Sequence, residues 1–98
     1  MDRKDEVEVH REEARHVYIA RVGGETAVLS YQEAGPGVLD FQHTEVPEAV
    51  QGQGVGEELV RQALDDVRER GLEVIPTCPF VAAFIRRHRE YRDLVAEK

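Results

Sequence analysis

The spacing of apolar residues changes once along the chain, and the change predicts strands in the first half and helices in the second. Up to residue 46, apolar and polar residues tend to alternate, which is typical of strands with one buried face. The ranges that show this pattern are 16–22, 25–32 and 38–46. A shorter alternation at Val7 and Val9 allows an edge strand before them. Gly23-Gly24 predicts a two-residue hairpin turn, in which both positions can take a positive φ.

The alternation is imperfect in the range 38–46. If it continued unbroken, one face of the strand would carry Leu39, Phe41, His43 and Glu45. The opposite face would also become polar toward the carboxyl end. Pro47 is expected to end the strand, because proline offers no amide hydrogen to a neighbour.

A helical pattern follows the glycine-rich segment 51–56. Apolar residues then recur at every fourth position, which predicts one amphipathic helix over 54–70. The residues that carry this spacing are Val55, Leu59, Ala63 and Val67. Gly71 is the expected C-cap of this helix, since glycine takes the left-handed conformation without a steric penalty.

The last quarter of the chain predicts a strand and a second helix. The strand covers 72–75 and stops at Pro76, and Pro79 suits the first position of a helix over 80–89. The residues expected to pack back on the core after this helix are Tyr91, Leu94 and Val95. The aromatic residues assigned to the core are Tyr18, Tyr31, Phe41, Phe80 and Phe84.

The order of these elements indicates the fold class. Three antiparallel strands are followed by a helix, a strand and a helix. The first helix makes a crossover, which should be right-handed and should place 72–75 parallel to 38–46. We therefore expect a single α+β domain, an α/β sandwich with a mixed, mostly antiparallel sheet.

Composition and charge narrow the classes of function. The 98 residues carry a net charge of −7 and the pI is about 5.0, which argues against sequence-independent nucleic-acid binding. The longest apolar run, 79–85, is far shorter than a membrane span, and the charged first six residues lack the apolar part of a secretory signal. We expect a cytoplasmic protein without a membrane partner. One cysteine excludes an internal disulfide, and the four histidines lack metal-ligand spacing.

The glycine-rich segment is the strongest chemical signal from local pattern. Its residues are Gln51, Gly52, Gln53, Gly54, Val55 and Gly56. The first amides of a helix have no internal acceptor, and glycines let an anion approach the backbone closely, so this segment suits a pyrophosphate. No Lys-Ser/Thr follows, so it is not a P-loop, and it does not match the dinucleotide fingerprint. A simple tight strand-to-helix turn explains the pattern equally well.

Two further features could carry chemistry. Cys78 precedes Pro79 and is expected at a helix N-cap, where the helix dipole favours a thiolate, although most free cysteines are only small buried side chains. His43 and Glu45 lie two apart on one strand and so share a face. A histidine beside a carboxylate can act as a general base, or it can be a surface pair at a strand end.

Several motifs in order resemble the GCN5-related N-acetyltransferases, in particular their small single-domain branch. Gln51-x-x-Gly54-x-Gly56 matches the Q/R-x-x-G-x-G/A motif of the superfamily. The other matching segments are 43–47, which reads His-Thr-Glu-Val-Pro, 76–81, which reads Pro-Thr-Cys-Pro-Phe-Val, 24–31 and 85–95. Arg89 departs from the pattern, where proline is expected. The likeness covers roughly residues 7–95. We expect residues 1–98 to form one domain, with residues 1–6 as a flexible charged tail.

The resemblance implies an N-acetyltransferase with acetyl-CoA as co-substrate, and the spacing of the histidines predicts no metal site. It implies that the amides of 51–56 hold the pyrophosphate and that the pantetheine arm runs beside Val46, between the strands 38–46 and 72–75. The acetyl group would then lie within reach of His43, Glu45 and Cys78. Direct attack by the acceptor amine and transfer through a Cys78 acyl-enzyme both stay open.

The identity of the acceptor is also left open, and so is the choice between an enzyme and a non-catalytic binding domain. The acceptor is an unknown amine, on a small molecule or on a protein. Larger members of the superfamily build this site with extra N-terminal helices, which the hairpin at Gly23-Gly24 replaces here, so the acceptor groove is expected to be open. The alternative is a sensor or adaptor domain that binds CoA or acyl-CoA without catalysis.

Overall fold

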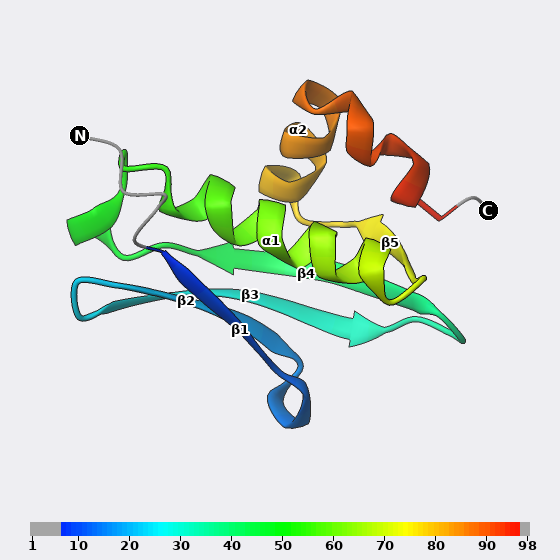
Figure 1. Cartoon of the computed structure of the whole chain (residues 1–98), viewed down its shortest axis with the longest axis horizontal. Coiled ribbons are helices and arrows are strands. Elements are labelled where there is room, and N and C mark those ends of the chain that lie inside the picture. The colour runs from blue at the N-terminus through cyan, green and yellow to red at the C-terminus, as the bar shows by residue number, and fades with distance from the viewer. Residues whose placement is uncertain (1–6, 97–98) are drawn as a thin grey trace.

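Five strands form one mixed sheet in the order β1-β2-β3-β4-β5, and two helices lie against it (Figure 1). The computed structural model describes residues 7–96, so the expected tail at 1–6 lies outside the described residues. The strands are β1 (Glu8–Glu12), β2 (Val17–Val22), β3 (Glu25–Glu33), β4 (Val38–Glu45) and β5 (Glu73–Pro76). The helices are α1 (Val55–Glu69) and α2 (Pro79–Arg87). The predicted α+β class is confirmed.

The pairing of the strands follows the sequence prediction. The first four strands pair antiparallel with their neighbours, and β5 pairs parallel to β4. The short edge strand that Val9 indicated exists as β1. The helix α1 connects β4 to β5 as the crossover, because two parallel strands cannot be joined by a tight turn.

Glycines sit where the backbone turns sharply. Gly23 and Gly24 have φ of 54° and 82°, so the hairpin between β2 and β3 has the predicted positive φ at both positions. Gly71 has a φ of 69° and ends α1 in a Schellman motif. In that motif the amide of Leu72 donates to the carbonyl of Val67 at 2.9 Å, and the amide of Gly71 donates to that of Arg68 at 3.1 Å.

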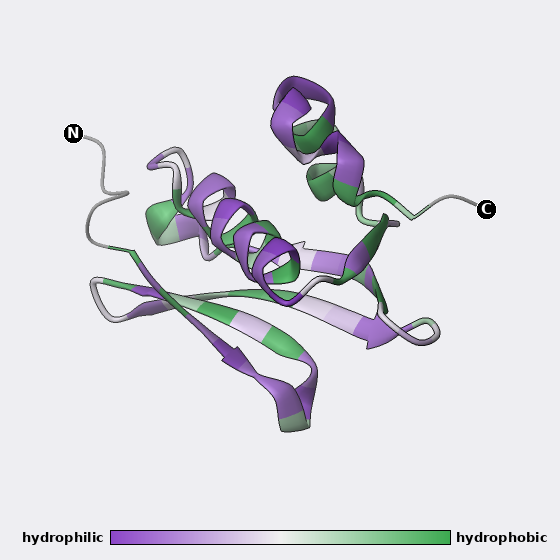
Figure 2. Ribbon diagram, turned by 45° about the vertical axis from the view of Figure 1, so that its right-hand side comes forward, coloured by the Kyte–Doolittle hydropathy of each residue, from purple (hydrophilic) through white to green (hydrophobic). Residues whose placement is uncertain are grey.

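The core lies between one face of the sheet and the two helices. Figure 2 shows the apolar side of α1 turned toward the sheet and its polar side turned outward. The buried residues of α1 are Val55, Gly56, Leu59, Val60, Ala63, Leu64 and Val67. Those that α2 contributes are Val81, Phe84 and Ile85. Burial of such side chains away from water is the main source of stability here.

The two helices lie side by side on that face. The segment after α2 reaches α1 through a hydrogen bond from Tyr91 Oη to Asp65 Oδ1 at 2.7 Å and an ion pair of Arg68 with Asp93 at 3.0 Å. Tyr91 and Leu94 are buried, as the sequence predicted for a closing segment. Within residues 7–96, both α-helices lie on one face of the sheet, and no α-helix lies on the opposite face.

A polar network joins β1 and β2 to the solvent side of α1. Asp66 accepts hydrogen bonds from Tyr18 Oη at 2.7 Å, Arg11 Nη1 at 2.7 Å and Arg70 Nη1 at 3.3 Å. Burial alone would raise the pKa of Asp66, but the hydrogen bonds from Tyr18 and Arg11 outweigh it and the pKa lies below its usual range. Burial, followed by the hydrogen bond to Asp66, raises the pKa of Tyr18.

We expect Asp66→Asn to lower the free energy of unfolding by about 1–2 kcal/mol at pH 7, because it removes the charge that Arg11 and Arg70 contact. The depressed pKa of Asp66 means that this contribution is complete above about pH 4 and is lost as the pH falls further. The difference between wild type and variant should therefore shrink in acid. Urea unfolding at pH 7 and at low pH measures it, with Glu73→Gln on the exposed surface of β5 as the control.

Candidate functional site

The strands β4 and β5 separate halfway along β4. Their pairing runs from Val38 opposite Glu73 to Phe41 opposite Pro76. One further hydrogen bond, from the amide of Cys78 to the carbonyl of Phe41 at 2.9 Å, turns the chain away into α2. From there on, the described part of β5 offers β4 no partner. The carboxyl-terminal half of β4 therefore has a free edge inside the fold.

A β-bulge changes which side chains of β4 face the helices. Ser30 pairs with His43 and Tyr31 pairs with Phe41, so Gln42 has no partner and the alternation slips by one residue. The face predicted from unbroken alternation is therefore wrong. Leu39 and Phe41 face the core, whereas His43 and Glu45, which were predicted on the same face, turn to the opposite one.

The bulge gives the two predicted acid–base residues an exposed position. His43 and Glu45 do share a face, with Nε2 of the histidine 3.4 Å from Oε2 of the glutamate. Their side chains are 65% and 75% exposed, on the sheet face away from the helices. Thr44 lies between them in the strand, pairs with Leu29 of β3, and directs its side chain toward the helices.

The glycine-rich segment makes the turn into α1. Gly52 and Gly54 have φ of 82° and 80°, a conformation that favours glycine, and Gly54 is the N-cap of α1. The first helical hydrogen bond runs from the amide of Glu58 to the carbonyl of Gly54 at 3.0 Å. Within the described residues, the amides of 52–57 have no backbone acceptor. Six successive donors at the positive end of a helix are thus free for an anion.

Two glutamines hold this turn in place. Gln51 Nε2 donates to the carbonyl of Val46 at 3.0 Å, which ties the turn to the end of β4. Gln53 Nε2 donates to the carbonyl of Ala49 at 3.4 Å. Across residues 7–96, Gln53 Oε1 is the one buried side-chain oxygen or nitrogen without a hydrogen-bond partner. An unpaired buried acceptor in the same turn is typical of a site that a ligand or water completes.

A groove with a volume of about 530 Å³ opens over this turn. It is lined by Thr44, Val46, Val50, Gln51, Gly52, Gly54, Val55, Gly56, Glu57 and Phe80. Phe80 was assigned to the core from the sequence, and this assignment is wrong. Its ring is the exposed large apolar side chain of the described surface, at 38%, and it forms one wall of the groove.

Gly56 allows the ring of Phe80 to lie close to the first turn of α1. A Cβ at position 56 would lie 3.0 Å from Phe80 Cζ and 3.1 Å from Val46 Cγ2. Close packing between α1, α2 and the end of β4 therefore favours glycine at this position, and Gly56 lines the groove.

A second groove lies on the other side of β4. It also measures about 530 Å³ and is lined by Thr26, His43, Thr44, Glu45, Val46, Pro47 and Gln51. Three of these residues, Thr44, Val46 and Gln51, line the first groove as well. The two grooves therefore adjoin each other at the free end of β4.

Cys78 stands next to this meeting point. It is the N-cap of α2, as predicted, and it is 4% exposed. Its Sγ lies 3.4 Å from Oγ1 of Thr44. Cys78 is not among the residues that line either groove. Thr44 was missed by sequence reasoning, because nothing in the pattern of 38–46 revealed the bulge that turns it inward.

The candidate residues thus fall into two groups. The structure brings together Val46 and the segment 51–56 except Gln53 along the first groove, and His43 with Glu45 in the second. Cys78 contacts Thr44 but neither His43 nor Glu45. Residues 7–96 contain no cluster of three or more His, Cys, Asp or Glu side chains suited to a metal ion. None of the helices described is both long and apolar enough to cross a membrane.

Comparison with known proteins gives a consistent set of matches. The family described as GCN5-related N-acetyl-transferase matches residues 17–94. The cattle (Bos taurus) protein NATD1 is 34% identical over 84% of this chain and 74% of its own length. The zebrafish (Danio rerio) protein NATD1 is 31% identical over 97% of this chain and 90% of its own length.

A solved structure agrees with the fold. The NMR structure of a GCN5-like protein from Staphylococcus aureus superimposes with a TM-score of 0.70 at 22% identity. The match covers 93% of this chain and 89% of that one. This likeness establishes that the arrangement of the sheet and the two helices is shared.

We expect Gly56→Ala to destabilise the protein through contact with Phe80, and Phe80→Ala to relieve part of that cost. The double variant should then show a coupling energy of about 0.5–1 kcal/mol between the two positions in urea unfolding. Gly71→Ala is the matched control, because a Cβ there meets nothing within 4 Å. Its effect, caused by the φ of 69°, should simply add to that of Phe80→Ala.

Proposed function

Since the chain belongs to the GCN5-related N-acetyltransferase family, we propose that it transfers an acetyl group from acetyl-CoA to an amine. The observation that carries this proposal is the row of amides at 52–57, which lack a backbone acceptor at the positive end of α1. A pyrophosphate has the charge and the acceptor oxygens to satisfy several such donors at once.

The free edge of β4 supports the position of the pantetheine arm. This arm carries two amide groups and needs hydrogen-bond partners along its length. Beyond Phe41, β4 has no partner in β5, so its backbone can pair with a ligand as with a strand. The first groove leads from the amides of 52–57 along Val46 to Thr44. The thioester of a bound acetyl-CoA would then lie where the two grooves meet.

The second groove supports an acceptor that arrives from the opposite face of the sheet. His43 and Glu45 lie there 3.4 Å apart, in a groove that shares Thr44 with the first one. As the amine nitrogen bonds to the acetyl carbon, the carbon–sulfur bond of the thioester breaks and CoA leaves as a thiolate that takes up a proton. The imidazole of His43 can accept the proton that the amine loses, and Glu45 can stabilise the resulting imidazolium. Acetyl-CoA supplies the acetyl group as an activated thioester.

We propose direct attack by the amine rather than transfer through Cys78. Cys78 is nearly fully buried, and its Sγ faces Oγ1 of Thr44. An acyl-enzyme would require Thr44 to move aside, whereas direct attack uses the two grooves as they stand. The position of Cys78 at the N-cap of α2, where the dipole favours a thiolate, is what speaks for the covalent route.

CoA binding is the first test of this function. Isothermal titration calorimetry should detect CoA and acetyl-CoA binding to the wild-type protein. In Gly54→Trp, binding should be lost, since the side chain would fill the groove over the free amides. Gly37→Trp is the control, because Gly37 has a similar φ of 75° in the loop between β3 and β4, away from both grooves. Absence of binding by the folded wild type would contradict the proposal.

Turnover separates an enzyme from a CoA-binding sensor and distinguishes the two routes. Release of the CoA thiol from acetyl-CoA can be followed with polyamines and lysine-containing peptides as acceptors. We expect His43→Gln to lower kcat/KM by about a hundredfold, which is typical of a lost general base, with CoA affinity unchanged. Cys78→Ala should retain activity within about threefold.

The contrary results are equally specific. Loss of turnover in Cys78→Ala, together with an acetylated Cys78 peptide in mass spectrometry, would establish the covalent route instead. CoA binding without turnover on any amine, unaffected by His43→Gln, would favour the sensor or adaptor.

A further inference from the structure

A carboxylate stands in the groove assigned to the phosphates. Glu57 lines this groove from the first turn of α1, where its own amide is one of the free donors. An acidic side chain stabilises a helix N-terminus, but it also repels a phosphate bound there. A cation close to Glu57 would offset this repulsion.

Arg87 is that cation. Its Nη2 lies 3.3 Å from Oε2 of Glu57, so the ion pair links the last residue of α2 to the first turn of α1. The two side chains are 53% and 55% exposed. Exposed ion pairs contribute little to stability, and their partners exchange readily. Arg87 can therefore leave Glu57 for a stronger acceptor without loss of the fold.

The geometry of α2 places Arg87 on the same wall as Phe80. The two residues are seven positions apart, which is close to two full turns, so they lie on one face of the helix about 10 Å apart along its axis. Phe80 lines the groove, and Arg87 lies farther along the same face of α2 in contact with Glu57, which also lines it.

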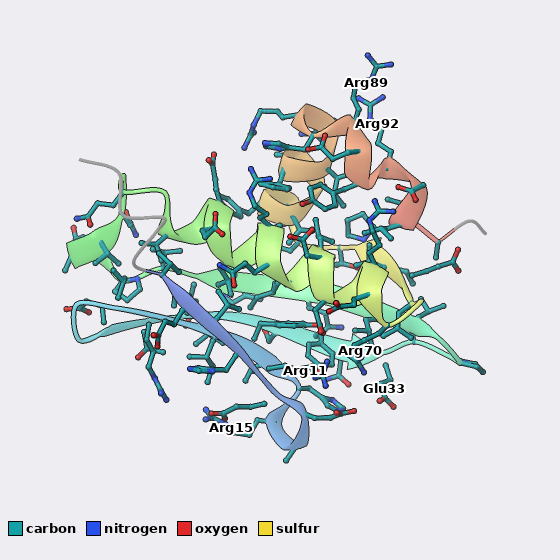
Figure 3. The ribbon with its side chains drawn as sticks, viewed as in Figure 1. Arg11, Arg15, Glu33, Arg70, Arg89 and Arg92 are labelled. Carbon is teal, nitrogen blue, oxygen red and sulfur yellow. The ribbon has the colours of Figure 1, made fainter. Side chains whose placement is uncertain are left out.

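Other arginines near these helices have different partners. The guanidinium of Arg61 lies over the ring of Phe84 and contacts Glu58 at 3.6 Å. Arg89 and Arg92 belong to the segment after α2 and extend outward at the far end of the molecule, as Figure 3 shows. Arg87 is thus the arginine tied by an observed contact to a residue that lines the groove.

We propose that Arg87 binds the 3′-phosphate of CoA. This proposal rests on the proposed function and concerns the part of the ligand beyond the pyrophosphate. A phosphate monoester carries nearly two negative charges at neutral pH, and a planar guanidinium can donate two parallel hydrogen bonds to it. On binding, Arg87 exchanges the carboxylate of Glu57 for the phosphate. The protein thereby distinguishes CoA from dephospho-CoA, which lacks this group.

Calorimetry with these two ligands tests the proposal at one fixed salt concentration. The wild type should bind CoA about tenfold more tightly than dephospho-CoA. In Arg87→Gln, CoA affinity should fall about tenfold and dephospho-CoA affinity should stay unchanged, so the ratio approaches one. Arg89→Gln removes the same charge outside the groove and should keep the wild-type ratio.

Glu57→Gln separates phosphate binding from a structural role of the ion pair. This variant keeps Arg87 and removes the repelling carboxylate, so its CoA affinity should equal or exceed that of the wild type. If Glu57→Gln weakened CoA binding as much as Arg87→Gln does, the effect would come from breaking the pair, and the proposal would be overturned.

The remaining outcomes are also distinct. Equal loss of both ligands in Arg87→Gln, or no loss of either, overturns the proposal while leaving the proposed function in place. Binding of neither ligand by the folded wild type overturns the proposed function, and this inference falls with it.

Discussion

The separation of β4 from β5 after Phe41 is the constraint on which the rest of the site depends. Two parallel strands that stayed paired to their ends would bury this region and leave no free backbone. Pro76 ends β5, and the amide of Cys78 makes the last contact with β4 before α2 departs. Because α1 starts beside the same opening, the free amides at its N-terminus and the free edge of β4 share one groove.

The bulge at Gln42 gives this opening two different sides. It directs Thr44 toward the helices and His43 with Glu45 toward the uncovered face, so the groove over the glycine turn and the groove over the acid–base pair meet along one strand. In the proposed function, this arrangement gives the anionic carrier and the amine separate grooves on the two faces of the sheet.

The charged groups around α1 are arranged differently at its two ends. The chain carries a net charge of −7, and the donors of the groove proposed for an anion are backbone amides at the N-terminus of α1 rather than a basic surface. The one carboxylate that lines this groove, Glu57, is matched by Arg87. On the other side of α1, Asp66 is satisfied by Tyr18, Arg11 and Arg70, which fixes the helix on the sheet at the end remote from the groove.

The sequence by itself determined the elements, their order, the hairpin at Gly23-Gly24, the end of α1 at Gly71 and the position of the glycine-rich turn. These features depend on local periodicity and on glycine or proline at single positions, so they can be read from neighbouring residues. Only the tertiary structure decided which way the end of β4 faces and that Phe80 forms a groove wall. Pairing between β3 and β4 creates the bulge, and the ring of Phe80 is placed beside Gly56 by the packing of α2 against α1, so both depend on contacts between residues distant in the chain.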